Sequence, residues 1–276
     1  MAKRLTVAAV AVPILILVVF LGPAWLLGLV VGLAAACCAW EFLRCTEKDA
    51  GQRFHIYAAV SAFLIPFLGS FFPWGRIIAL MLFLLFAVMF TELMLSFRQE
   101  TTMEFETVAV VILAGGVFPV LLGSIAQLRL MEYGSVYAFL PFVAAFSSDA
   151  GAYFAGIALG KHHLTPRLSP HKTLEGSVGG FLAAIVMMLL YGLVLMAFGY
   201  QVKLAVIAVY GFFGSLASQL GDLSFSAVKR LFGVKDYGTL LPGHGGMMDR
   251  MDSMFWAAPV IELLCLWVPA ITRIMD

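Results

Sequence analysis

The chain has 276 residues, of which 62% are hydrophobic and only 12% are charged. Soluble domains carry roughly a quarter charged residues, so this composition excludes an ordinary soluble protein and favours one embedded in a bilayer. The formal net charge of +1 predicts no general affinity for nucleic acid.

Apolar runs long enough to cross about 30 Å of hydrocarbon recur along the whole chain. The first run could pass for a signal peptide, but no small-x-small cleavage site follows Phe20, so we interpret it as a retained span. The nine expected spans are 6–21, 24–43, 55–72, 77–97, 107–127, 135–159, 177–198, 204–225 and 253–271.

The predicted fold is an all-α integral membrane protein with about nine transmembrane helices and an active site at its cytoplasmic face. We expect an N-terminal membrane region of about five spans, residues 1–127. A C-terminal catalytic membrane region of about four spans, residues 128–276, would carry two polar cytoplasmic loops, 160–176 and 226–252.

The basic residues are distributed unevenly between the two sides of the nine-span arrangement. With the N-terminus inside, thirteen of the 17 Lys and Arg residues fall on the cytoplasmic side. The four on the opposite side are Arg76, Arg129, Lys203 and Arg273. This asymmetry predicts a cytoplasmic N-terminus and places any chemistry at the cytoplasmic face.

The eighth span carries a polar stripe that ends in a carboxylate. Ser215, Ser218, Asp222 and Ser226 are spaced 3, 4 and 4 residues apart, so they share one helical face. A charge in the bilayer costs at least about 2.5–3.5 kcal/mol, so the stripe must face protein or water. One alternative is that the stripe only bonds neighbouring helices. Serine and glutamine would suffice for that role, which favours a functional Asp222.

A second acidic cluster opens the ninth span. Asp249 and Asp252 are three residues apart and would share a face if helical, although either carboxylate could also cap the helix. The run from Gly243 to Gly246 allows backbone N–H groups to converge on phosphate oxygens. Carboxylates beside cationic groups predict metal-assisted phosphoryl or nucleotidyl transfer.

The loop 160–176 combines basic residues with hydroxyls immediately before the seventh span. Read alone it is also compatible with an ordinary positively charged cytoplasmic loop. Residues 169–175 resemble a helix entry with Thr173 or Ser169 as cap. Asp149, one helical turn from Tyr153, either pairs with a basic group of this loop or joins the site directly.

Three glutamates near or within spans lack basic or glycine companions in the sequence, which favours helix packing or an interfacial position for each: Glu41, Glu92 and Glu262.

The segment from Ser226 to Asp252 resembles the signature of the phosphatidate cytidylyltransferases, also called CDP-diacylglycerol synthases. The resemblance extends to the runs 149–156 and 169–176 and covers about the last half of the chain. One departure is His171, which stands where the family usually has Lys or Arg.

The resemblance implies transfer of CMP from CTP to phosphatidate with Mg²⁺ as cofactor. It implies Asp222 and Asp249 as metal ligands and Lys172 as the phosphate-handling lysine, and Asp252 is a further catalytic candidate. The expected substrate-binding residues surround these four: Asp149, Ser169, Ser226, Lys229, Arg230, Lys235, Asp236, His244, Gly245, Gly246 and Arg250. The expected partners are CTP, phosphatidate and the bilayer, with a second copy of the chain as a further candidate and no nucleic acid. The expected location is the cytoplasmic (inner) membrane of a bacterium.

Three other functions compete with this hypothesis. A CTP-dependent polyprenol or phytol kinase would share a membrane site and nucleotide chemistry. An ion-coupled secondary transporter would use Asp149 and Asp222, but it needs polar access from both faces. A CDP-alcohol phosphotransferase is disfavoured because its Asp-Gly-x-x-Ala-Arg motif is absent from the sequence.

Overall fold

The computed structural model describes residues 12–47, 51–72, 75–98, 102–240 and 245–273. The chain is mainly helical and forms two compact units. The first unit comprises Met1–Leu130 and Phe232–Met251, and the second comprises Met131–Leu231 and Asp252–Asp276. The segment between Asp222 and Asp252 is therefore divided between two units.

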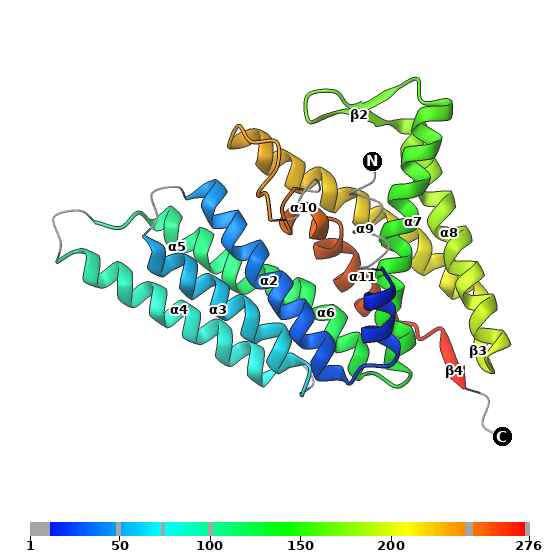
Figure 1. The fold of residues 1–276 in the computed structure, drawn as a ribbon, viewed down its shortest axis with the longest axis horizontal. Coiled ribbons are helices and arrows are strands. Elements are labelled where there is room, and N and C mark those ends of the chain that lie inside the picture. The colour runs from blue at the N-terminus through cyan, green and yellow to red at the C-terminus, as the bar shows by residue number, and fades with distance from the viewer. Residues whose placement is uncertain (1–11, 48–50, 73–74, 99–101, 241–244, 274–276) are drawn as a thin grey trace. The chain divides into compact units, whose positions relative to one another are not determined.

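The first unit is a bundle of long apolar helices, in which α2, α3 and α6 pack side by side (Figure 1). A π-helical turn joins α5 to α6, and its Gly115 lies against the backbone of Ala58, where a β-carbon would clash. The elements are a helical segment at 12–20, α2 (Ala24–Thr46), α3 (Gln52–Gly69), α4 (Arg76–Ser96), α5 (Phe105–Ile112), η1 (Leu113–Val117), α6 (Phe118–Leu130) and α10 (Met248–Met251).

The second unit is built on three helices, with α7 packed along α8 and α8 along α9. An antiparallel hairpin of β1 and β2 connects α7 to α8. The short strand β3, between α8 and α9, pairs antiparallel with β4, which follows α11. The elements are α7 (Gly134–Leu159), β1 (His163–Thr165), β2 (Ser169–Thr173), α8 (Leu174–Ala197), β3 (Tyr200–Val202), α9 (Leu204–Leu231), α11 (Met254–Trp267) and β4 (Ile271–Arg273).

Six helices of the described residues are long and apolar enough to cross a membrane, as expected of an integral membrane protein. They correspond to expected spans two and four to eight, and they are α2, α4, the continuous helix Phe105–Leu130, α7, α8 and α9. The first expected span lies partly outside the described residues. The third forms α3, and the ninth forms α11, whose 14 residues extend about 21 Å.

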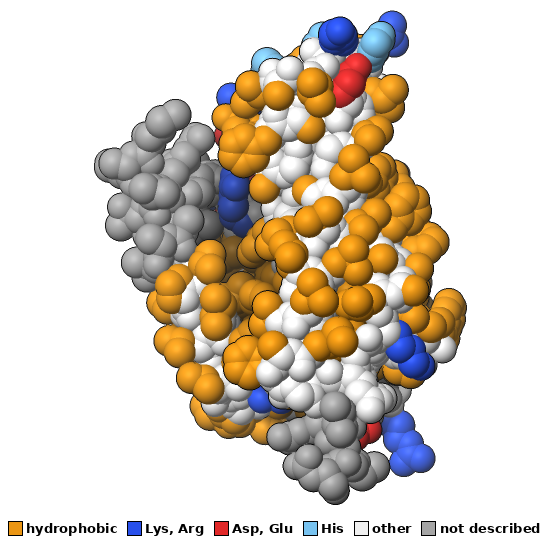
Figure 2. Space-filling model, turned by 90° about the vertical axis from the view of Figure 1, so that its right-hand side faces the viewer, with side chains coloured by type: hydrophobic (Ala, Val, Ile, Leu, Met, Phe, Trp, Pro, Cys, Tyr) orange, Lys and Arg blue, Asp and Glu red, His pale blue; other side chains and the backbone are white. Residues whose placement is uncertain are grey.

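The outer face of α8 has the character of a lipid-facing surface. Figure 2 shows hydrophobic side chains over the middle of this side of the molecule, Lys and Arg side chains towards both ends, and His side chains towards one end. Leu182, Val186, Leu190 and Val194 are about half exposed to the surroundings, although all four are apolar. Contiguous apolar exposure of this kind marks a membrane or protein contact.

Two local predictions need correction. Residues 169–173 form strand β2 rather than a helix entry, and the helix begins only at Leu174, after Thr173 has capped it. The Thr173 hydroxyl oxygen accepts the Gly176 N–H at 3.1 Å, so the cap itself is confirmed. Asp249 and Asp252 do not share a helical face, because α10 ends at Met251.

Candidate active site

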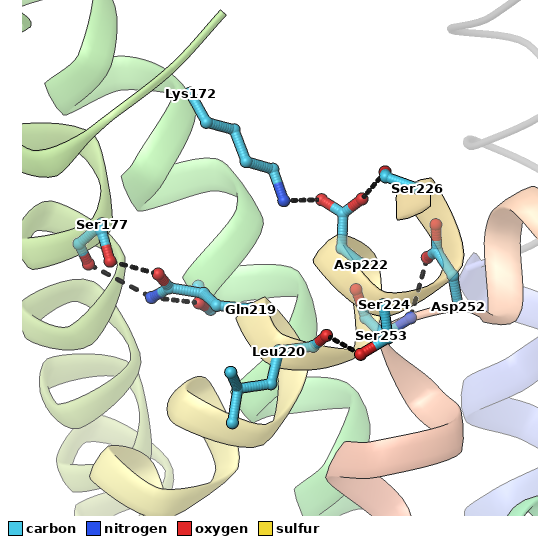
Figure 3. A network of polar contacts seen from close by, with 10 residues as sticks. Lys172, Ser177, Gln219, Leu220, Asp222, Ser224, Ser226, Asp252 and Ser253 are labelled. Atoms are coloured by element: carbon cyan, nitrogen blue, oxygen red, sulfur yellow. Dashed lines mark hydrogen bonds and ion pairs between the residues drawn. The ribbon is translucent and has the colours of Figure 1, made fainter. Parts of the chain in front are cut away.

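Asp222 and Lys172 form an ion pair in the second unit (Figure 3). Asp222 projects from α9 and Lys172 from the end of strand β2, immediately before α8 begins. The second Asp222 carboxylate oxygen accepts a hydrogen bond from the Ser226 hydroxyl, one turn further along α9, at 3.3 Å. The hairpin therefore brings Lys172 to the carboxylate that the polar stripe presents.

The rest of the stripe binds neighbouring helices. Ser215 is fully buried, and its hydroxyl lies 2.7 Å from that of Ser148 on α7. The Gln219 amide donates to the Ser177 carbonyl on α8 and accepts from the Ser177 hydroxyl (Figure 3). The prediction that the stripe faces protein rather than lipid is confirmed. The stripe bonds neighbouring helices and also borders a cavity, which Gln219 and Asp222 both line.

A cavity of about 280 Å³ opens at the Asp222 end of the stripe. Asp149, His171, Lys172 and Asp222 line it, together with Tyr153. The structure thus brings together Asp149 and the basic loop, the two features whose relation the sequence left open. The Lys172 ammonium group in this lining is a donor that suits a phosphorylated ligand.

Asp252 lies half-buried near Asp222 in the same unit. Burial, followed by the negative charge of Asp222, raises the pKa of Asp252 to about 7, and nearby Lys229 acts in the opposite direction. One Asp252 oxygen accepts the Ser253 N–H at 2.8 Å. The negative charge of Asp222 beside a carboxylate of raised pKa makes this a place where a cation is favoured.

Two residues of the expected basic set support the hairpin and the site from α9. Arg230 donates from its guanidinium Nε to the Leu168 carbonyl at 3.3 Å, next to Ser169, the first residue of β2. Lys229 is only 9% exposed, so its ammonium group is directed into the unit rather than into solvent.

Asp249 holds the backbone of its own loop in the first unit. Its carboxylate oxygen Oδ2 accepts the N–H groups of Tyr237 at 2.9 Å and Gly246 at 3.0 Å. The Gly246 amide, which the sequence suggested for phosphate, therefore already donates to Asp249. Gly245 has φ of +84°, a left-handed conformation that favours glycine at this turn.

The remaining expected residues are less closely tied together. Lys235, Asp236 and Arg250 are exposed, and Asp236 lines a second cavity, of about 760 Å³, within the first unit. Trp40 and Arg44 of α2 also line that cavity. His244 lies outside the described residues.

Glu41 is the residue of this region that the sequence interpretation missed. It sits on α2, is 7% exposed, and accepts the Met248 N–H through Oε2 at 2.9 Å. Its carboxylate also abuts Gly238 and Gly246, which are the glycine companions it lacks in the sequence. A buried acidic residue in an apolar span was the available indication, but its partners lie some 207 residues away.

The donor set suits a hard divalent cation. Within the second unit, Asp222 and Asp252 offer carboxylate oxygens of the kind that Mg²⁺ prefers. Within the described part of the chain, no group of three or more His, Cys, Asp or Glu side chains is assembled to hold a metal. Asp252, whose pKa is raised, and the neighbouring carboxylate of Asp222 still fit a cation by charge.

Comparison with known proteins defines the class. The model of the cytidylyltransferase family matches residues 2–268, nearly the whole chain, so the similarity is not confined to the last half as the sequence suggested. The chain belongs to the cytidylyltransferase family and is a nucleotidyltransferase.

Particular relatives carry a more specific name. The phosphatidate cytidylyltransferase of Bacillus subtilis (strain 168) is 38% identical over 205 residues, which are 73% of this chain and 74% of that protein. Those of Staphylococcus saprophyticus and Staphylococcus aureus (strain COL) are 40% and 41% identical over 136 and 134 residues. These two matches cover 49% and 48% of this chain, and 51% and 50% of the relatives.

Proposed function

We propose that the chain is a phosphatidate cytidylyltransferase, which converts CTP and phosphatidate into CDP-diacylglycerol and pyrophosphate. The observation that carries the proposal is the pairing of Lys172 with Asp222 at a cavity, in a chain of the cytidylyltransferase family. Relatives named for this activity support it. Neither the kinase nor the transporter alternative is favoured by that family.

The chemistry is a displacement at phosphorus. A phosphate oxygen of phosphatidate attacks the α-phosphorus of CTP, and the bond from that phosphorus to the bridging oxygen breaks as pyrophosphate leaves. The attacking phosphate monoester has a second pKa of about 6, so it is largely a dianion at neutral pH and needs no general base. The main obstacle is the repulsion between two polyanions.

The residues of the second unit address this repulsion. Asp222 holds the Lys172 ammonium group at the cavity, where it offsets negative charge on a bound phosphate. Lys229 adds a second, largely buried cation near Asp252. Arg230 fixes the hairpin through Leu168 and so supports the position of Lys172.

We assign the cofactor as Mg²⁺, with Asp222 and Asp249 as its ligands and Asp252 as a further candidate. When bound, the ion would neutralise charge on the triphosphate and on the departing pyrophosphate. Asp249 also orders the loop that contains Gly245 and Gly246.

We further propose nine spans, with the N-terminus and the active site at the cytoplasmic side of a bacterial cytoplasmic membrane. The uneven distribution of basic residues supports this orientation. A headgroup-level site lets a two-tailed lipid meet water-soluble CTP, and it is compatible with a homodimer. A cysteine introduced at His163 should react with an impermeant thiol reagent only from the cytoplasmic side; reaction from outside would reverse the orientation.

The function is tested with purified protein in lipid nanodiscs, given CTP, phosphatidate and Mg²⁺. We expect CDP-diacylglycerol and pyrophosphate in equal amounts by mass spectrometry and a coupled pyrophosphate assay. Production of CDP and a phosphorylated lipid alcohol, when a polyprenol is supplied in place of phosphatidate, would assign the chain to the kinase reaction instead.

A further inference from the structure

Two carboxylates in the first unit hold the backbone at Tyr237 and at residues 246–248. Glu41 reaches it from α2 and accepts the N–H of Met248, the first residue of α10. Asp249 reaches back from α10 and accepts the N–H groups of Tyr237 and Gly246. Both carboxylates are at least nine-tenths buried, so these bonds are shielded from water.

The space around Glu41 shows that the segment is fitted to this side chain. A β-carbon on Gly238 would collide with Glu41 Oε1, and one on Gly246 would collide with Oε2. At both glycines the three nearest atoms in the direction of that β-carbon belong to the Glu41 side chain. Glycine is therefore required at both places as long as Glu41 occupies its site.

This arrangement costs free energy. Glu41 Oε1 is buried and has no hydrogen-bond partner among the described residues. A buried acceptor without a partner costs about 1–3 kcal/mol, so the carboxylate is a poor choice if only the packing of α2 matters. What the Glu41 carboxylate gains in return is the hydrogen bond from the Met248 N–H, at the start of α10.

We propose that Glu41 is a positioning residue for cytidylyl transfer, which acts by fixing the loop that carries Asp249. The proposal rests on the function proposed above, with Asp249 as a metal ligand. Glu41 touches neither substrate in this account. It sets where the Asp249 carboxylate stands, because it anchors the residue immediately before it.

The test uses full-length protein in nanodiscs and three variants. Glu41→Ala removes the acceptor, whereas Glu41→Gln keeps an oxygen for the Met248 N–H. Glu92→Ala is the matched control, because Glu92 is also a glutamate of a membrane helix in the first unit but bonds Tyr57 and Arg53 instead.

We expect Glu41→Ala to lower kcat on the order of 10²-fold, since small misplacements of catalytic groups have effects of this size. The KM values for CTP and phosphatidate should change by less than about threefold, and the Mg²⁺ concentration for half-maximal rate should rise. Glu41→Gln should recover most of kcat, and Glu92→Ala should match the unmutated protein. A normal kcat in Glu41→Ala, or equal losses in Glu41→Ala and Glu92→Ala, would overturn the proposal.

A readout without turnover separates this inference from the proposed function. Hydrogen–deuterium exchange without metal or substrate should show faster exchange at residues 237–251 in Glu41→Ala but not in Glu92→Ala. If exchange there is unchanged, the inference fails even where CDP-diacylglycerol forms. If exchange rises as expected but the unmutated protein makes no CDP-diacylglycerol, the proposed function fails instead.

A double-mutant cycle guards against a variant that merely folds poorly. Gly238→Ala alone should reduce activity, because its β-carbon meets the Glu41 carboxylate. Added to Glu41→Ala, the same change should cost little more, since the obstacle is gone. Additive losses in the double variant would show that Glu41 and Gly238 do not act through one another.

Discussion

Asp222 and Asp249, the two carboxylates to which the resemblance assigns a metal, have different partners in this chain. Asp222 bonds a side-chain ammonium and a hydroxyl at the wall of a cavity. Asp249 is 9% exposed and bonds two backbone N–H groups, with Glu41 anchoring the residue before it. An ion pair at a cavity can exchange its partner for a ligand, whereas a carboxylate on backbone amides also determines local structure. Substitutions can therefore separate the effect of the negative charge from the effect of the hydrogen bonds to the backbone.

The largest effect is expected from Lys172→Met, which keeps an unbranched side chain, one atom shorter, but removes its charge. Loss of one preorganised cation from a phosphoryl-transfer site lowers kcat by about 10²–10³-fold. The measurement is CDP-diacylglycerol formation at saturating CTP. Lys161→Met, at an exposed lysine on the same connection, is the control and should keep its rate within about twofold. Equal activity of the two variants would remove Lys172 from the site.

Asp249→Asn separates charge from scaffold in the first unit. The amide oxygen can still accept the Tyr237 and Gly246 N–H groups, so hydrogen exchange of residues 237–251 should remain slow. Without the negative charge, kcat should fall on the order of 10²-fold and the Mg²⁺ requirement should rise. Asp249→Ala should lose both the cytidylyltransferase activity and the slow hydrogen exchange of these amides. Full activity of Asp249→Asn would contradict its assignment as a metal ligand.

Gln219→Met probes the hydrogen bonds by which the stripe joins neighbouring helices. It leaves the Ser177 carbonyl and hydroxyl and the Ser215 hydroxyl without their amide partner, which costs about 2–3 kcal/mol of stability. Thermal unfolding in detergent should therefore occur at a lower temperature. Ser224→Ala, which removes only a bond to its own helix at Leu220, should have a much smaller effect. An unchanged Tm for Gln219→Met would show that the network adds nothing to helix packing.

The smallest effect concerns Asp252 and pH. Its pKa is raised from an ordinary value of 3.8 to about 7, so the folded state holds this proton more tightly than the unfolded state does. That contribution to stability is present at low pH and is lost as pH rises through about 7. Asp252→Asn, which stays neutral, should therefore gain stability over the unmutated protein between about pH 5 and about pH 8, by on the order of 1–2 kcal/mol.

Metal-free thermal unfolding measures this difference, and added Mg²⁺ should reduce it by compensating the charge of Asp222 and Asp252. A Tm difference that does not change with pH would show that Asp252 has an ordinary proton affinity in the folded state.

Local patterns predicted much of the fold. Hydropathy located the helices because each apolar run is continuous, and the spacing of Ser215, Ser218 and Asp222 correctly predicted a face turned to protein. The Thr173 cap was also predictable, since a hydroxyl three residues before Gly176 is a local feature. The hairpin was not, because residues 163–173 carry no alternation of polar and apolar residues.

The candidate site was predictable only where its residues belong to motifs. Lys172 and Asp222 stand in polar runs, whereas Glu41 stands alone in an apolar helix and bonds a residue far along the chain. Pairing over such a separation depends on tertiary packing, which composition and periodicity do not encode. For the same reason the sequence did not indicate that Phe232–Met251 packs with the first unit.

Transfer of the cytidylyl group can be tested by following the α- and γ-phosphorus atoms of CTP separately. CTP labelled at its α-phosphorus or at its γ-phosphorus is given to the purified protein with phosphatidate and Mg²⁺. We expect the α-label to enter the lipid and the γ-label to be released in pyrophosphate. Both processes should be lost in Lys172→Met. Appearance of the γ-label in lipid, or of neither label at a rate above that of Lys172→Met, would contradict cytidylyl transfer.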